Sequence, residues 1–200
     1  MDQQALENLV REVLGDEYRA LHVTRYTLTE DIREGQATIV CLIEGATEGK
    51  GKAVEGVGVG MVDALFAGFK RTLSGDFPSL NHIHFCGFTI EGDFSQTSNH
   101  AKTDVVGNVR VEVENSSGRR FQFSSASKSM SASSVDVVVK AVEHFVNAEL
   151  AVSRVYDWIE DANRRHRPDL AEQYVRRLSE LVQNSSYSES LERKKQRAGI

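Results

Sequence analysis

The chain has 200 residues, 40% of them hydrophobic and 26% charged, which suits a folded protein of one ordinary domain or two small ones. It is too short to contain a (β/α)8 barrel, which needs roughly 250 residues. The net charge of -5 at pH 7 argues against a nucleic-acid backbone as the main partner.

The spacing of apolar residues predicts the elements of the first half of the chain. A helix, three strands and a second helix are expected at 3–18, 21–28, 36–45, 52–59 and 61–73. The third strand has the weakest pattern. Gly75 and Pro78 end the second helix.

The second half predicts the same order of elements again. Strands are expected at 82–90, 108–114 and 119–127, with a long polar loop over 91–104 and a turn at 116–118. A helix then begins near Ser134 and continues well past residue 150, because its apolar positions recur at helical spacing as far as Ile159.

The two halves form an internal repeat. The segment EGVGVGMVDALFAGFKRTL (55–73) aligns without gaps with KSMSASSVDVVVKAVEHFV (128–146). Gly60 and Ser133 would cap the two helices, and Asp63 and Asp136 would each be the third helical residue, where a carboxylate faces unpaired N–H groups. We therefore expect an α+β fold of duplicated strand-strand-strand-helix units, covering 21–75 and 79–150.

Two segments lie outside the repeat. Residues 1–20 form the N-terminal helix, and 151–200 form a helical hairpin with a basic tail. The last helix carries an apolar stripe, made of Leu170, Tyr174, Leu178, Leu181 and Val182. This stripe either packs on the same chain or meets a second copy, whereas the basic tail is expected to be solvated.

The sequence contains no pattern typical of a targeting peptide, a membrane span or a disulfide framework. No run approaches the roughly 18 apolar residues of a membrane span, and the acidic start is unlike a signal peptide. We expect a cytoplasmic protein without a membrane or nucleic-acid partner. Cys41 and Cys86 lie in apolar stretches, so both are expected to be buried thiols.

Glycines 56, 58 and 60 directly precede the second helix and are the first candidate site. Their G-x-G-x-G spacing differs from the G-x-G-x-x-G of dinucleotide sites. Two interpretations stay open. The glycines allow a tight turn with φ > 0, or they let a small carboxylate approach the backbone N–H groups at the helix start.

Metal and nucleophile chemistry have less support. His82 and His84 share one face of the predicted strand and could chelate a metal, but two half-buried strand histidines are the more economical interpretation. The serines at 124–134 lack a G-x-S-x-G elbow and suit close packing and capping. We therefore expect no catalytic residue, no bound metal and no cofactor.

Residues 21–150 resemble the C-terminal regulatory domain of 2-isopropylmalate synthase and citramalate synthase. The segment Gly58-Val59-Gly60-Met61-Val62-Asp63-Ala64-Leu65 matches the family's G-x-G-P-x-D-A-like motif, with Met61 in place of proline. Leu80–His84 resembles the strand that opens the second half, and Asp136–Ala148 resembles its closing helix. His82 stands where an aromatic is common, and 91–104 replaces a shorter turn.

The resemblance implies a function. In this family the domain is a dimer that binds leucine or isoleucine as a feedback inhibitor of branched-chain amino-acid biosynthesis. It implies an effector site at Gly58, Gly60, Val62, Asp63, His82, Cys86, Val105 and Gly107, where backbone N–H groups hold a carboxylate and Asp63 or Asp104 meets an ammonium group.

We therefore expect a non-catalytic homodimer that binds a small branched-chain amino acid or a related acid. The alternative is a dimerisation or interaction module whose effector site has decayed and which acts with a separate catalytic synthase chain. An enzyme in its own right is the third hypothesis.

Overall fold

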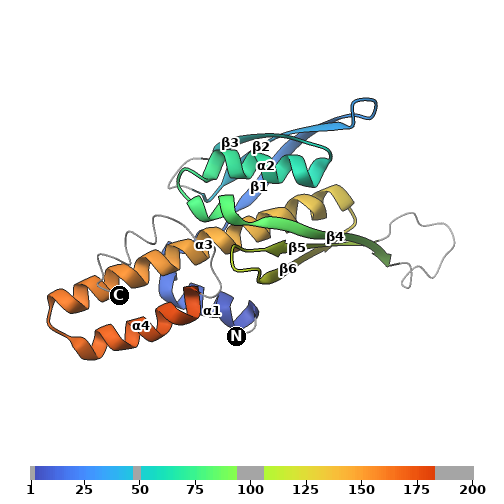
Figure 1. Ribbon diagram of the computed structural model, residues 1–200. Coiled ribbons are helices and arrows are strands. Elements are labelled where there is room, and N and C mark those ends of the chain that lie inside the picture. Colours follow the sequence, from blue (N-terminus) through green and yellow to red (C-terminus); the bar gives the residue numbers. More distant parts are fainter. Residues whose placement is uncertain (1–2, 47–50, 94–105, 183–200) are drawn as a thin grey trace.

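The computed structural model describes residues 3–46, 51–93 and 106–182, which form two similar α+β units and a helical extension (Figure 1). The first unit consists of β1 (His22–Asp31), β2 (Gln36–Glu44), β3 (Lys52–Gly58) and α2 (Met61–Leu73). The second consists of β4 (His84–Asp93), β5 (Val106–Glu114), β6 (Arg120–Ser127) and α3 (Met130–Arg164). The expected duplication is therefore confirmed.

Each unit is a three-stranded antiparallel sheet whose strands follow chain order, with its helix on one face. In β2 the alternation is plain, since Ala37, Ile39, Cys41 and Ile43 are buried and the residues between them are less so. The first strand of each sheet contains an irregularity, between Val23 and Tyr26 in β1 and between Phe85 and Gly87 in β4. The two units thus share a local distortion as well as a topology.

The remaining elements connect and extend the two units. They are α1 (Gln3–Leu14), the 3-10 helices η1 (Gly15–Glu17) and η2 (Pro78–His82), and α4 (Pro168–Val182). Helix α3 passes from the second sheet to the hairpin with α4, so it runs the length of the described molecule (Figure 1).

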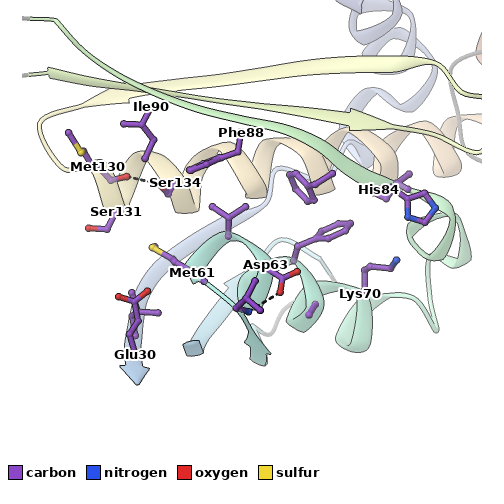
Figure 2. A pocket seen from close by; sticks show the side chains of 18 residues that line it. Glu30, Met61, Asp63, Lys70, His84, Phe88, Ile90, Met130, Ser131 and Ser134 are labelled. Atoms are coloured by element: carbon purple, nitrogen blue, oxygen red, sulfur yellow. Dashed lines mark hydrogen bonds between the residues drawn. The ribbon is translucent and has the colours of Figure 1, made fainter. Parts of the chain in front are cut away.

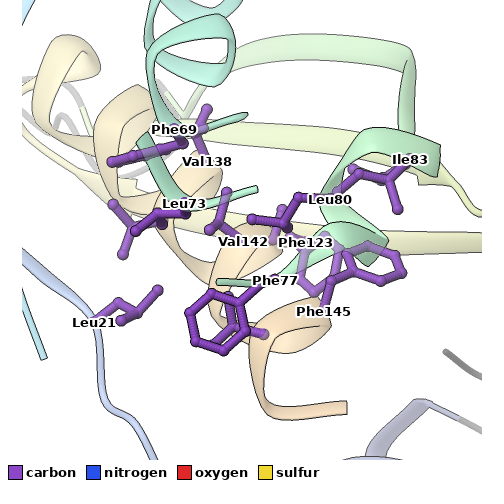
Figure 3. Close-up of a cluster of buried hydrophobic side chains, with 14 of the residues drawn as sticks. Leu21, Phe69, Leu73, Phe77, Leu80, Ile83, Phe123, Val138, Val142 and Phe145 are labelled. Atoms are coloured by element: carbon purple, nitrogen blue, oxygen red, sulfur yellow. The ribbon is translucent and has the colours of Figure 1, made fainter. Parts of the chain in front are cut away.

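A single hydrophobic core joins both units (Figure 3). Phe69 and Leu73 of α2 lie in it with Val142 and Phe145 of α3, all fully buried. Leu80 of the connecting helix η2 closes the same cluster. The two halves therefore share one buried apolar core.

Polar side chains of α3 fix the connecting segments. Glu143 accepts hydrogen bonds from the Tyr18 hydroxyl (2.7 Å) and the Leu21 N–H (2.8 Å). The buried carboxylate of Glu149 accepts the Ser79 N–H at 3.0 Å. These bonds satisfy backbone donors that the irregular segments would otherwise bury unpaired.

The apolar stripe of α4 packs mainly within the chain. Leu178 and Leu181 are buried, and Tyr174 lies against Trp158 of α3 with ring centroids 5.4 Å apart. Val182 stays 47% exposed. The stripe is therefore largely used by the hairpin itself.

The start of α3 differs from the expectation. Ser129, not Ser133, caps the helix, because its hydroxyl accepts the Ala132 N–H at 3.2 Å. Ser133 is buried and its hydroxyl lies 2.8 Å from that of Ser127. Asp136 therefore falls in the second turn, where it pairs with Lys140 at 2.8 Å.

Three further expectations about exposure and strand bounds are wrong. His82 ends η2 rather than opening a strand, and both His82 and His84 are exposed. Cys86 is also exposed, whereas Cys41 is buried as expected.

Within the described residues, no helix combines the length and the apolar character needed to cross a membrane.

Candidate functional site

A groove of about 940 Å³ runs between α2, β4 and the start of α3 (Figure 2). The first unit contributes α2 and the end of β1, and the second unit contributes β4 and the start of α3. Its lining residues are Leu28, Glu30, Val59, Gly60, Met61, Val62, Asp63, Phe66, Ala67, Lys70, Ile83, His84, Phe85, Phe88, Ile90, Met130, Ser131 and Ser134.

The wall of the groove is apolar and partly open to solvent. Phe66 of α2 and Phe85 of β4 meet edge to face, with ring centroids 4.3 Å apart. Phe88, Ile90 and Met130 keep 48%, 44% and 49% of their surface exposed. A ligand with an apolar side chain would therefore bury surface that the chain alone leaves in water.

One wall of the groove begins at the start of α2. Gly60 caps the helix with an extended backbone, φ -164°. Asp63 lies in the first turn, and its carboxylate accepts the Val59 N–H at 3.1 Å (Figure 2). The N–H group just before the helix is thus already bonded to an anionic side chain of the protein.

Gly56 and Gly58 of the glycine run serve close packing, not a turn. None of the glycines at 56, 58 and 60 has a positive φ, so the expectation of a turn with φ > 0 is wrong. A Cβ on Gly56 would lie 1.7 Å from the Ala64 carbonyl oxygen, and one on Gly58 would lie 2.3 Å from an Asp63 carboxylate oxygen. These glycines let β3 approach α2 directly.

Lys70, two helical turns after Asp63, brings a positive charge into the groove. Its ammonium lies 5.4 Å from the centroid of the Phe66 ring and donates to the Asn81 carbonyl at 3.4 Å. Burial lowers the pKa of Lys70. His84 lines the same groove, and Figure 2 shows both side chains at the end away from Glu30.

The structure brings together part of the expected site. Gly60, Val62 and Asp63 line the groove, and Gly58 packs behind Asp63. His82, Cys86 and Gly107 do not line it, although a Cβ on Gly107 would lie 3.0 Å from the side chain of Met130 at its rim. Val105 and Asp104 lie outside the described residues.

Several groove residues were missed by the sequence reasoning. Lys70, Phe66, Phe85 and Phe88 carry most of its aromatic and cationic character. The spacing of Asp63, Phe66 and Lys70 on one helical face was the available signal. Its meaning depends on β4 lying opposite, which periodicity alone does not reveal.

Metal ligation finds no support in the described part of the chain, where no group of three or more His, Cys, Asp or Glu side chains has a suitable arrangement. His82 and His84 therefore lack a third ligand among these residues.

Comparison with known families now assigns the chain. Residues 1–146 match the LeuA allosteric (dimerisation) domain. A comparison with curated proteins gives no match. Because the family match covers nearly three quarters of the sequence and includes both repeats, the chain belongs to the family of LeuA allosteric (dimerisation) domains, whose role is regulatory or dimerising.

Proposed function

We propose that this chain is an effector-binding regulatory protein whose groove takes a small branched-chain amino acid or a related acid. The observation that carries the proposal is the position of the groove. Its walls come from the glycine-motif helix of one repeat, and from the opening strand and the helix start of the other. The family match supports a regulatory role for this arrangement.

A ligand in this groove would contact both repeats at once. Phe66 belongs to the first unit and Phe88 to the second, so an apolar side chain between them would tie the units together. Binding would favour one relative placement of α2 and β4, which is how a small molecule changes the conformation of a regulatory domain.

Thermal unfolding with the branched-chain amino acids and their 2-oxo acids tests the proposal. A ligand at 100 times its dissociation constant should stabilise the protein by about 2.7 kcal/mol, which is several degrees for a chain of this size. Ala67→Phe should fill the groove and remove the shift. Ala126→Phe, at an exposed position of β6, is the matched control and should keep the shift.

We propose as a second role that the chain forms a homodimer, or pairs with a separate catalytic synthase chain, through the outer face of the first sheet. Val40, Leu42 and Val57 are 48%, 42% and 45% exposed there. Strand register places Val40 and Leu42 on the same face of β2, with Val57 beside them on β3. Such a face suits an apolar partner surface.

The outer face of the second sheet provides the contrast, because it carries Arg110, Glu112 and Gln122. Leu42→Lys should therefore disrupt the association and Ala126→Lys should not. Light scattering at micromolar concentration should give about twice the chain mass of 22.2 kDa for the parent and for Ala126→Lys. A parent at the mass of one chain would contradict the homodimer.

A further inference from the structure

The groove contains the ammonium group of Lys70, which forms no ion pair with a carboxylate of the described residues. Lys70 is partly buried, and its ammonium contacts a ring face and a backbone carbonyl. Burial lowers its pKa. An ammonium held against apolar surface in this way loses part of its hydration, so an anion beside it would be favoured.

The other end of α2 is a poor place for an anion. The carboxylate of Asp63 accepts the Val59 N–H and faces the positive end of the helix dipole. Glu30 lines the same end of the groove (Figure 2). A ligand carboxylate placed at Gly60 would therefore meet two negative side chains.

We propose that Lys70 binds the carboxylate of the effector, and that the effector's apolar chain lies between Phe66 and Phe88. This inference rests on the proposed effector site and reverses the orientation expected from the glycine motif. His84, beside Lys70 on the groove wall, is placed to add a second donor. The ligand class is a branched aliphatic carboxylic acid.

Calorimetry with matched probes and variants tests this assignment. The probes are leucine, 4-methyl-2-oxopentanoate and 4-methylpentanoate, with uncharged 4-methylpentanamide as the isosteric control. Lys70→Met keeps an apolar side chain that reaches as far as the Cε position and removes the ammonium, and Lys70→Arg restores the charge. Lys140→Met, at an exposed position of α3 outside the groove, is the matched control.

The carboxylate that binds the parent most tightly should bind Lys140→Met with the same affinity and Lys70→Arg with nearly the same affinity. It should bind Lys70→Met at least about tenfold more weakly than the parent. The amide should not distinguish the variants. Equal carboxylate binding by the parent and by folded Lys70→Met, checked by circular dichroism, would overturn the role of Lys70 and leave the effector groove standing. Failure of every probe to bind the parent would overturn both.

Discussion

His144 should make the stability of this protein depend on pH, because α3 buries it among aromatic rings. Its side chain is enclosed by Phe121, Phe123 and Phe145, with ring centroids at 4.9, 5.4 and 5.1 Å. The residue is 7% exposed, and its Nε2 has no hydrogen-bond partner among the described residues. Nδ1 lies 4.0 Å from the carboxylate of Glu7 on α1.

This environment disfavours the imidazolium. Burial, with a smaller contribution from the charge of Arg119, lowers the pKa of His144 from 6.5 to about 4. Between these values the unfolded chain holds a proton that the folded chain lacks, so stability rises with pH across this window and falls as the pH drops below 6.5. The free energy of unfolding is expected to drop by about 1 kcal/mol from pH 7.5 to pH 5.5 and by about 3 kcal/mol by pH 4.

Urea unfolding of the parent and His144→Phe at several values between pH 7.5 and pH 5.5 measures this contribution. Over that range, the drop in the free energy of unfolding should be smaller in His144→Phe than in the parent by about 1 kcal/mol. The matched control, His22→Phe, removes an imidazole from the exposed surface of β1 instead of the core. Parallel profiles for the parent and His144→Phe, or an equal flattening in His22→Phe, would refute the reasoning.

Two further predictions concern packing and thiol exposure. Gly56→Ala should lower the free energy of unfolding by at least about 2 kcal/mol, because its Cβ would meet the backbone of Ala64. Gly75→Ala, where the Cβ has open space around it, should change the free energy of unfolding by under about 1 kcal/mol. Similar urea midpoints for the two variants would contradict this prediction. A thiol reagent should modify Cys86 in the native protein and Cys41 only after unfolding, because Cys41 is buried and burial raises its pKa to about 11. Two fast-reacting thiols in native protein would show that Cys41 is accessible.

Periodicity was sufficient for most of the elements and for their duplication, because strands such as β2 and helices such as α2 have one buried face. It was insufficient at the start of α3, where several serines offer equivalent caps and tertiary packing selects Ser129. It also failed for Cys86, which is the extra residue at the irregularity of β4, between Phe85 and Gly87. Such a residue has no partner on β5 to hold it in the alternating pattern.

The candidate site was predictable where it depends on local sequence and unpredictable where it depends on assembly. Gly60 and Asp63 follow from helix-capping chemistry, which needs only neighbouring residues. Lys70 becomes a groove residue only because η2 and β4 return across α2, so that its ammonium reaches the Asn81 carbonyl. The pattern within α2 places Lys70 on one face with Asp63 and Phe66, but it does not reveal that β4 lies opposite that face.

The glycines of the motif have two different roles in the structure. Gly56 and Gly58 pack against α2, whereas Gly60 lines the groove. Gly56 and Gly58 touch α2 so closely that any side chain there would displace the helix, along with Asp63 and the groove wall. A Cβ on Gly60 would meet no non-neighbouring atom of the described residues within 4 Å, and Gly60 lines the groove itself. A loss of ligand binding caused by Gly58→Val would therefore report displaced packing, whereas Gly60 is the position of the motif at which a ligand contact can be probed in a folded protein.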